Sequence, residues 1–292
     1  MAEAVFPDKR AVRRAFSRAA GTYDAHAVLQ REVGQRLLEH LEGIRIEPER
    51  VLDLGCGSGA SLGTLAQRFP AARVMGLDLA YPMLQLARGR TPWWRRLARA
   101  ASMPALVCGD AERLPLAASS HQMIFSNLTL QWCRPEAAFA EAARVLGPGG
   151  LFLFSTLGPD TLKELRAAFE PAEPARHVNR FIDMHDLGDE LVHAGFSDPV
   201  MEMEVITLEY ASLAAVVADL RAIGASNALP ERPRGLGGRA RWREAEARYE
   251  GQRRDGALPA TYEVIYGHAW KAAPRTAPDG RAILQFHPRR PG

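Results

Sequence analysis

Apolar residues in this chain form either short continuous runs or helical spacings, and the two kinds of segment alternate. The clearest case is residues 51–69, VLDLGCGSGASLGTLAQRF, where an apolar run with an acid leads into glycines and then into a helical spacing. This order predicts a buried strand, a tight turn and the start of a helix. Because glycine carries no Cβ, a ligand can lie directly against the backbone N–H groups of such a turn.

The same alternation continues along the chain and predicts seven strands, five of which alternate with helices. Such alternation is typical of an α/β protein with a mostly parallel sheet. The last two strands are separated by an insertion at 212–258, which we expect to form a lid or a wall of the substrate site. Besides the first strand, we predict strands over 71–80, 105–116, 151–155, 200–210 and 260–270, and over 121–132 a strand that runs into a short helical turn. We predict helices over 8–20, 135–146, 160–169, 183–194, 213–223 and 239–254, with helical spacing also in 28–41.

The glycine turn fits more than one kind of ligand. A dinucleotide turn has the spacing G-x-G-x-x-G and holds a pyrophosphate at a helix N-terminus. Here Gly55, Gly57 and Gly59 are spaced G-x-G-x-G, and Asp53 stands just before them. An acid at that point favours a cationic ligand over a pyrophosphate. A glycine turn without any ligand is the remaining alternative.

Further acids stand at the ends of the following strands. Asp78 lies about 20 residues past the loop, where a carboxylate can accept hydrogen bonds from both hydroxyls of a ribose. The alternative role for Asp78 is a helix N-cap. Met83, in the next helix, is placed to touch an adenosine, and Asn127 marks the carboxyl end of a strand, which faces the ligand crevice in open α/β sheets.

The motif D-x-G-x-G-x-G resembles the first motif of the class I S-adenosylmethionine-dependent methyltransferases. The resemblance implies a Rossmann-like fold whose seven-stranded, mostly parallel sheet ends in an antiparallel strand. It also implies that Asp110 and Ala111 hold the adenine amino group. The predicted cofactor-binding residues are Asp53, Gly55, Cys56, Gly57, Gly59, Asp78, Leu79, Met83, Asp110, Ala111 and Asn127.

Length and composition set the outline of the domains. The chain has 292 residues, 47% hydrophobic and 24% charged, as expected of a globular protein. We predict a helical N-terminal cap (1–45), one methyltransferase domain (46–272) and a disordered tail rich in Pro and Arg (273–292).

Composition also bears on location. No run of about 18 apolar residues occurs, so we expect no membrane insertion. Charges near the N-terminus argue against export. The three cysteines are far apart and form no CxxC pair, which favours a reducing cytoplasm and argues against a disulfide framework or a metal site.

A Trp- and Arg-rich stretch, 88–104, is longer than a usual helix-to-strand connection. It is interpreted as a surface helix docked by its tryptophans, as a basic docking face for an acidic protein, or as a membrane-surface helix. Only three of the chain's 37 basic residues are lysines, a bias typical of genomic base composition. The (N/D)-PP-(Y/F) tetrapeptide of DNA-base methyltransferases is missing after the fourth strand, so we expect no nucleic-acid substrate.

Several longer blocks resemble one family. FSRAAGTYDAHAVLQ, SNLTLQWC, FSTLGPDTLKEL, HVNRF, LRAIGASN and TYEVIYGHAW look like the malonyl-[acyl-carrier protein] O-methyltransferases of biotin synthesis, over roughly residues 10–270. The chain departs from the shorter members in its longer Trp- and Arg-rich stretch and in its tail. The resemblance implies methylation of the free carboxylate of malonyl carried on a phosphopantetheine thioester, or on coenzyme A.

That reaction needs no general base, because a carboxylate is already ionised at pH 7. It does need a cation for the substrate carboxylate, and an arginine fork suits one. The candidates are Arg18, Arg180 and Arg221, with Tyr23, His26, Asn127, Gln131 and Trp132 as further crevice residues. Acyl-carrier proteins are acidic, so the expected docking arginines are Arg88, Arg90, Arg95, Arg96 and Arg99.

Two rival functions remain open. One is methyl transfer to a quinone precursor or a small free acid. The other is a methyltransferase-like assembly factor of a respiratory complex, whose relatives share the DTL-x-EL and G-x-SN blocks. These factors lack the FSRAAGTYDAHAVLQ segment, which favours the biotin enzyme.

Overall fold

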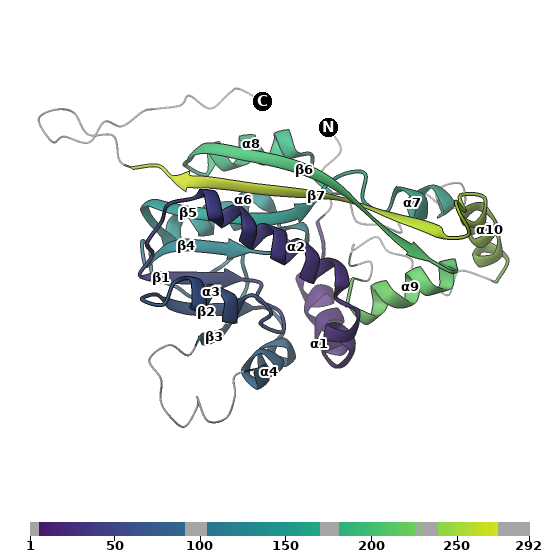
Figure 1. Ribbon diagram of the computed structural model, residues 1–292, viewed down its shortest axis with the longest axis horizontal. Helices are drawn as coiled ribbons and strands as arrows, with labels where there is room; N and C mark the ends of the chain where they lie inside the picture. Colours follow the sequence, from purple (N-terminus) through teal and green to yellow (C-terminus); the bar gives the residue numbers. More distant parts are fainter. Residues whose placement is uncertain (1–5, 91–103, 170–180, 226–227, 229–238, 274–292) are drawn as a thin grey trace, which may run out of the picture.

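The computed structural model describes residues 6–90, 104–169, 181–225, 228 and 239–273. Its centre is a seven-stranded sheet in the order β3-β2-β1-β4-β5-β7-β6 (Figure 1). The first five strands in the chain are parallel, and β7 runs antiparallel to both of its neighbours. The predicted fold class is therefore confirmed.

The parallel strands bring their carboxyl ends to one edge of the sheet. They are β1 (Arg50–Leu54), β2 (Arg73–Asp78), β3 (Ala105–Cys108), β4 (His121–Ser126) and β5 (Leu146–Leu157). β3 is shorter than the predicted strand over 105–116, because the chain turns at Asp110 and Arg113. β5 starts before the predicted residue 151, since its Pro-Gly-Gly segment still belongs to the strand.

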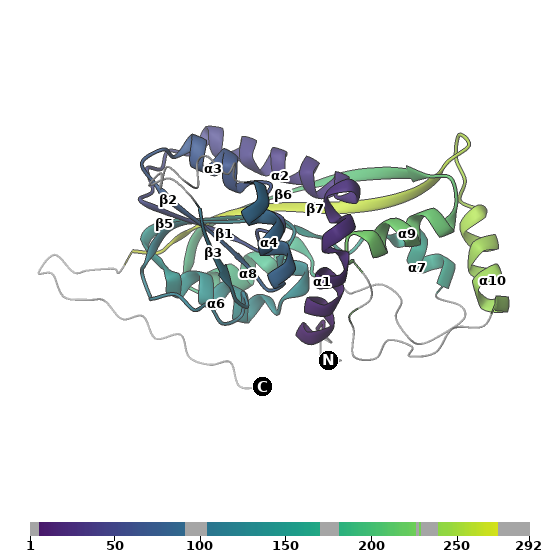
Figure 2. The same ribbon diagram turned by 90° about the horizontal axis from the view of Figure 1, so that it is seen from below.

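Helices cover both faces of the sheet (Figure 2). On one face lie α2 (Val28–Glu39) and α3 (Leu62–Arg68), and on the other lie α6 (Pro135–Val145) and α8 (Met184–His193). Side chains of a strand alternate between the faces. In β1, Val51 faces the α2 and α3 side while Leu52 and Leu54 face the α6 side. Asp53 lies two residues after Val51, so its carboxylate points to the same face of the sheet, toward α2 and α3.

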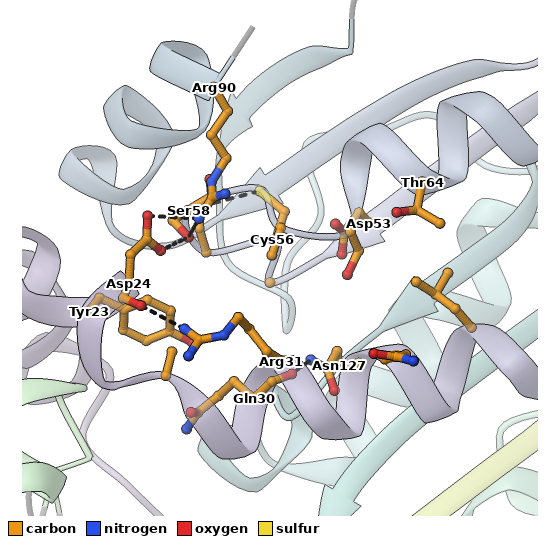
Figure 3. A pocket seen from close by; sticks show the side chains of 18 of the residues that line it. Tyr23, Asp24, Gln30, Arg31, Asp53, Cys56, Ser58, Thr64, Arg90 and Asn127 are labelled. Carbon is orange, nitrogen blue, oxygen red and sulfur yellow. Dashed lines mark hydrogen bonds and ion pairs between the residues drawn. The ribbon is translucent and has the colours of Figure 1, made fainter.

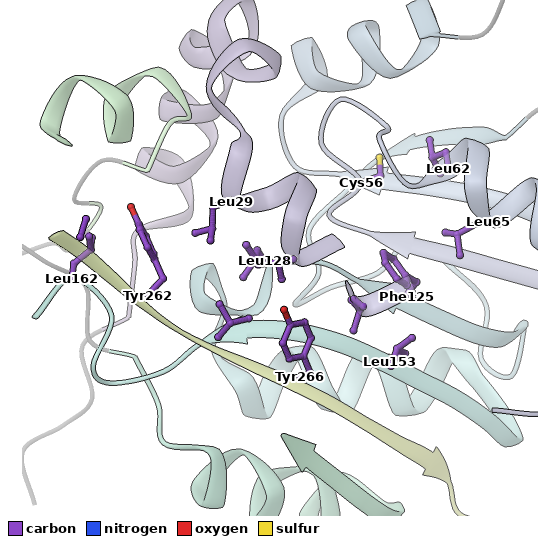
Figure 4. Packing of buried hydrophobic residues seen from close by; sticks show 14 of the residues in the cluster. Leu29, Cys56, Leu62, Leu65, Phe125, Leu128, Leu153, Leu162, Tyr262 and Tyr266 are labelled. Carbon is purple, nitrogen blue, oxygen red and sulfur yellow. The ribbon is translucent and has the colours of Figure 1, made fainter. Parts of the chain in front are cut away.

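The core on the α2 face reaches from the glycine loop to the far strands of the sheet. Figure 4 shows Leu29, Phe125 and Tyr266 in this one cluster, contributed by α2, β4 and β7. α2 is therefore stabilised mainly by burying its apolar side chains against the sheet, and less by the helix propensity of its residues.

The last two strands extend past the rest of the sheet. β6 (Phe196–Tyr210) pairs with β7 (Leu258–Lys271) along most of their length, whereas β5 pairs with β7 only from Val264 onward. The projecting end carries α7 (Lys163–Phe169), α9 (Leu213–Ala222) and α10 (Arg239–Glu250) (Figure 1).

The N-terminal helix lies across the carboxyl edge of the sheet. α1 (Lys9–His26) packs against α4 (Tyr81–Arg90) and α9, and the short 3₁₀ turns η1 (His40–Gly43) and η2 (Leu130–Trp132) complete the described elements. Asp8 caps α1 as predicted, since its carboxylate accepts a hydrogen bond from the Arg10 amide at 2.8 Å. The predicted end at residue 20 is wrong: the helix continues through Gly21, because its later residues pack against α9 and the glycine loop.

Candidate functional site

The glycine loop after β1 has a backbone that favours glycine. Gly55, Gly57 and Gly59 have φ values of +75°, +53° and +82°. A Cβ at Gly55 would collide with the side chain of Thr129, and one at Gly59 would lie 2.8 Å from Ala87 of α4. Only at Gly57 is the space open, with the Tyr23 ring 3.9 Å from the Cβ position. The loop therefore presents Gly57 toward the crevice.

Asp78 is bound to this loop. Its carboxylate accepts hydrogen bonds from the Gly57 amide at 2.9 Å and from the Ala80 amide at 2.7 Å. Burial raises the pKa of Asp78, and these two donors offset part of that rise. The N-cap interpretation is thus partly right, because one oxygen serves the start of α4, and each oxygen keeps a further lone pair for a ligand.

Asp53 faces the other side of the loop. Its side chain is buried, and within the described part of the chain its carboxylate has no hydrogen-bond or ion-pair partner. Burial and the nearby Asp78 raise the pKa of Asp53 to about 8. A buried carboxylate in this state gains most from a cationic ligand.

A cavity of about 800 Å³ lies between α2, α3 and the loop (Figure 3). Asp53 lines it together with Gln30 and Arg31 of α2. The side-chain oxygen of Gln30 is buried without a hydrogen-bond partner, and an orphaned buried acceptor costs free energy unless a ligand or water satisfies it. Arg31 directs its guanidinium to the Asp24 carbonyl oxygen at 2.6 Å.

The end of α1 is fastened to the loop by three polar side chains, here called the Asp24 clasp (Figure 3). The Ser58 hydroxyl donates to Asp24 at 2.5 Å, and Arg90 of α4 forms an ion pair with Asp24 at 2.7 Å. Arg90 also donates to the Ser58 carbonyl oxygen at 2.8 Å. The clasp holds Tyr23 over Gly57.

A second cavity, of about 80 Å³, lies between α1 and the ends of β2, β3 and β4. The Lys9 ammonium projects into this region and pairs with Asp110 at 3.1 Å and Glu112 at 3.0 Å. Burial lowers the Lys9 pKa, but the charges around it outweigh this and raise the pKa above its ordinary value. Phe16 contacts Trp132 edge to face, with ring centroids 5.4 Å apart. The space left has room for roughly three water molecules.

The structure gathers most of the predicted cofactor residues around these two cavities. All of them except Gly59, which packs against α4, line one cavity or the other. The larger is lined by Asp53 and Cys56, the smaller by Asp78, Leu79, Met83, Asp110 and Ala111, and both by Gly55, Gly57 and Asn127. Burial raises the Cys56 pKa, so its thiol is neutral.

The predicted crevice residues divide. Tyr23 and Trp132 line the smaller cavity. Asn127 reaches both cavities, but its amide nitrogen donates to the Gln30 carbonyl oxygen at 2.8 Å and its oxygen accepts from Ser155 at 2.8 Å. It therefore joins β4, α2 and β5. Gln131 donates to the Leu128 carbonyl oxygen and lines neither cavity.

His26 and the predicted substrate arginines lie further out. Nδ1 of His26 is 2.8 Å from Asp219 of α9. Arg18 and Arg221 are exposed and line neither of the two cavities, and Arg180 is outside the described residues. Of the predicted docking arginines, Arg90 belongs to the Asp24 clasp, and Arg95, Arg96 and Arg99 are outside the described residues.

Lys9, Phe16 and Arg31 were not predicted as site residues. Lys9, Phe16 and Tyr23 are spaced seven residues apart, which places them on one face of α1. If the predicted helix had continued past residue 20, this spacing would have placed the three side chains on one face, toward the crevice. Arg31 had no comparable signal, because it follows the helix break at Ala27.

The chain is similar to known proteins over nearly its whole length. A methyltransferase domain family matches residues 52–154, from β1 to β5. The chain is 55% identical to the malonyl-[acyl-carrier protein] O-methyltransferase of Gallionella capsiferriformans, over 95% of this chain and 96% of that protein. It is 54% identical to the one from Laribacter hongkongensis, over the full length of both.

The chain belongs to the malonyl-[acyl-carrier protein] O-methyltransferase family. Solved structures support the fold of this family member. The YcgJ protein of Bacillus subtilis has a TM-score of 0.57 at 16% identity and covers 82% of this chain and 98% of its own. A putative methyltransferase of Bacillus halodurans has a TM-score of 0.55 at 17% identity, covering 82% and 99%.

The described residues show neither a metal-binding cluster nor a membrane-spanning helix. They contain no group of three or more His, Cys, Asp or Glu side chains arranged to hold a metal ion. Among these residues there is also no helix with both the length and the apolar character needed to cross a bilayer.

Proposed function

We propose that this family member transfers the methyl group of S-adenosylmethionine to the free carboxylate of malonyl-acyl-carrier protein, giving the methyl ester that starts pimeloyl assembly in biotin synthesis. The observation that carries the proposal is the match, from end to end, to relatives named for this reaction. The acid-lined crevice supports it, because a sulfonium-bearing nucleoside needs both a carboxylate for its cation and acceptors for its ribose.

The cofactor's parts have matching groups along the crevice. We assign the ribose hydroxyls to Asp78, the adenine to Met83, Asp110 and Ala111, and the positive charge of the amino-acid end to Asp53. Arg31 lines the same cavity as Asp53 and supplies a guanidinium for the amino-acid carboxylate.

Adenosine entry requires α1 to move. The Lys9 ammonium already forms an ion pair with the Asp110 carboxylate, and the cavity there has a volume of about 80 Å³. The first half of α1, which carries Lys9 and Phe16, is therefore the part that shifts, while the Asp24 clasp secures its other end.

The chemistry rests on placement. S-adenosylmethionine supplies a methyl group on a good leaving group, and the acceptor carboxylate is ionised at pH 7. What the chain contributes is alignment of oxygen, carbon and sulfur, which is worth up to about 7–11 kcal/mol in well-oriented reactions. Tyr23 stays a neutral phenol, because burial and then the Asp78 and Asp24 charges raise its pKa, so it positions rather than accepts protons.

The malonyl carboxylate needs a cation near the methyl group. We retain Arg18, Arg180 and Arg221 as candidates. Arg18 and Arg221 have no hydrogen-bond or ion-pair partner among the described residues, but neither lines the two cavities, and Arg18 is on the face of α1 opposite Phe16 and Tyr23, which makes it the weaker candidate.

The carrier also needs a dock, for which we retain Arg88, Arg90, Arg95, Arg96 and Arg99. The commitment of Arg90 to the Asp24 clasp makes it the least available of the set. We further propose a cytoplasmic location, which suits the three free thiols.

Complementation tests the function in a cell. Expressed in a biotin auxotroph that lacks the malonyl methylation step, the wild-type chain should restore growth without biotin, and the Asp78→Ala variant should not. Growth only with added biotin, from soluble protein that binds S-adenosylmethionine, would favour a rival: an assembly factor or a methyltransferase of a quinone precursor or small free acid.

A further inference from the structure

The outer face of α1 carries a line of arginines, here called the α1 arginine stripe: Arg10, Arg14 and Arg18. They are spaced four residues apart and are exposed, whereas Val12 and Ala19 on the opposite face are buried. Residues four apart on a helix are surface neighbours. The stripe is therefore a continuous strip of positive charge on the helix that covers the cofactor crevice.

The three positive charges of the α1 arginine stripe are not paired within the described chain. None of these guanidinium groups has a hydrogen-bond or ion-pair partner among the described residues. Some other arginines of the described chain are paired, as Arg144 is with Glu141 and Arg253 is with Glu250. Compositional bias toward arginine explains the residue type, but it does not explain why three neighbouring guanidinium groups on one face form no ion pair with the described residues; the nearby Asp8 carboxylate binds the Arg10 backbone amide instead.

The spacing of these arginines lowers the stability of α1. Like charges four residues apart destabilise a helix. The first turn of α1 contains no acidic residue, so Arg10 also lies at the positive end of the helix dipole. Positions that break a local rule without a compensating contact are expected at functional surfaces.

We propose that the α1 arginine stripe forms part of the docking surface for the acidic carrier protein that presents the malonyl group. The inference rests on the proposed function and names the surface that recognises its partner. Charge complementarity steers such an encounter and fixes its orientation. α1 has the stripe on one face and Phe16 and Tyr23 on the other, so a docked carrier lies about one helix diameter, roughly 10–12 Å, from the crevice.

An anionic membrane is a weaker match for the same charge. A helix that lies on a bilayer inserts an apolar face, but the apolar face of α1 is buried against the protein. The exposed large hydrophobic residues of the described chain are on other elements, among them Val28 of α2 and Tyr81 of α4.

The test compares two double charge reversals. Arg10→Glu with Arg14→Glu alters the stripe and leaves Arg18, the substrate candidate, in place. The matched control is Arg45→Glu with Arg73→Glu, exposed residues at the amino end of the strands. Both variants change the net charge equally. The carboxylate introduced at position 14 lies four residues before Arg18, an attractive spacing, so the stripe variant keeps its helix.

Methyl transfer is measured with malonyl-carrier protein and with malonyl-pantetheine, which has no protein surface. The stripe variant should raise the KM for the carrier substrate at least about tenfold with kcat unchanged, and its rate should depend less on salt. Its kinetics with malonyl-pantetheine and the control variant's kinetics with both substrates should match wild type.

Two results would overturn the inference. One is an unchanged carrier KM in the stripe variant, and the other is an equal rise with malonyl-pantetheine. An unchanged carrier KM together with loss of the wild type's binding to vesicles of anionic lipid would assign the stripe to a membrane instead. A wild-type enzyme that transfers no methyl group to malonyl-carrier protein would instead refute the proposed function, and the inference with it.

Discussion

The Gly57 amide donates a 2.9 Å hydrogen bond to the Asp78 carboxylate, so the glycine loop and the acid that ends β2 are held as one unit. The bond fixes the backbone that approaches the ligand and orients the carboxylate proposed to hold the ribose. A change at either residue therefore disturbs both halves of the cofactor site.

Replacing Asp78 tests the ribose assignment. Asp78→Ala removes two charge-assisted hydrogen bonds, each worth about 1.5–3 kcal/mol. We expect calorimetry to show S-adenosylmethionine affinity reduced at least about a hundredfold, which corresponds to about 2.8 kcal/mol. Asp189→Ala, an exposed acid of α8, serves as the control and should bind as wild type. Unaltered affinity of Asp78→Ala would make the ribose assignment wrong.

The loop glycines should respond differently to alanine. Gly59→Ala places its Cβ 2.8 Å from Ala87, so we expect a stability loss of about 1–3 kcal/mol by denaturant unfolding. Gly57→Ala meets no atom within 3.9 Å, and its positive φ alone should cost about 1 kcal/mol while the Cβ blocks the ligand. Gly63→Ala, in a helix and in open space, should be neutral or stabilising. Equal cofactor affinity in Gly57→Ala and wild type would show that the ligand does not approach this residue.

Asp53 predicts a pH dependence of stability. Its pKa rises from 3.8 to about 8 on folding, so between these values the native state holds a proton that the unfolded chain releases. Stability of the ligand-free enzyme should therefore fall as pH rises from about 4 to about 8. Asp53→Asn should remove that part of the slope, as measured by urea unfolding across the range. The same slope in both proteins would show that Asp53 is ionised at neutral pH.

Cofactor binding should lower the pKa of Asp53, which burial raises. A cation beside Asp53 favours the ionised carboxylate, so binding below about pH 8 releases its proton. Calorimetry in two buffers of different ionisation enthalpy should detect this release in wild type and a smaller release in Asp53→Asn.

The Asp24 clasp should control the mobility of α1 more than the stability of the fold. Arg90 and Asp24 are nearly half exposed, and such pairs contribute at most about 1 kcal/mol. Arg90→Ala should leave the unfolding midpoint nearly unchanged but increase amide exchange in the second half of α1. Lys163→Ala, which breaks an exposed pair with Asp160 away from α1, is the matched control. Identical exchange of α1 in the two variants would contradict the role of the clasp.

The sequence predicted the parallel part of the fold well, and most of the residues that it proposed for the cofactor line the two cavities, because both depend on local patterns. An apolar run that ends in an acid, followed by glycines, fixes a strand, its turn and the position of Asp53 and Asp78. The end of α1 was misplaced, because Gly21 is a poor helix former that tertiary packing overrides. Asn127 was placed at the crevice, but its bonds to Gln30 and Ser155 join segments far apart in the chain, and no local pattern reports them.

The residues that bind the substrate were harder to predict, because no local sequence pattern indicates them. Arg18, Arg180 and Arg221 were selected because arginine suits a carboxylate, not because a spacing brought them together. Lys9 lies in the crevice only because α1 crosses the edge of the sheet, and Arg31 only because α2 packs on one face of it. That crossing depends on contacts with α4 and α9, which come much later in the sequence. The roles of the three arginines stay predictions.

The most direct test of the central claim is methyl transfer in solution. Purified enzyme, S-adenosylmethionine labelled in its methyl group and malonyl-acyl-carrier protein should give a labelled carrier whose mass rises by one methyl group, and mild alkali should release the label as methanol from the ester. Free malonate at the same concentration should accept little or none. Efficient labelling of free malonate, or an unlabelled carrier with active cofactor binding, would contradict the account.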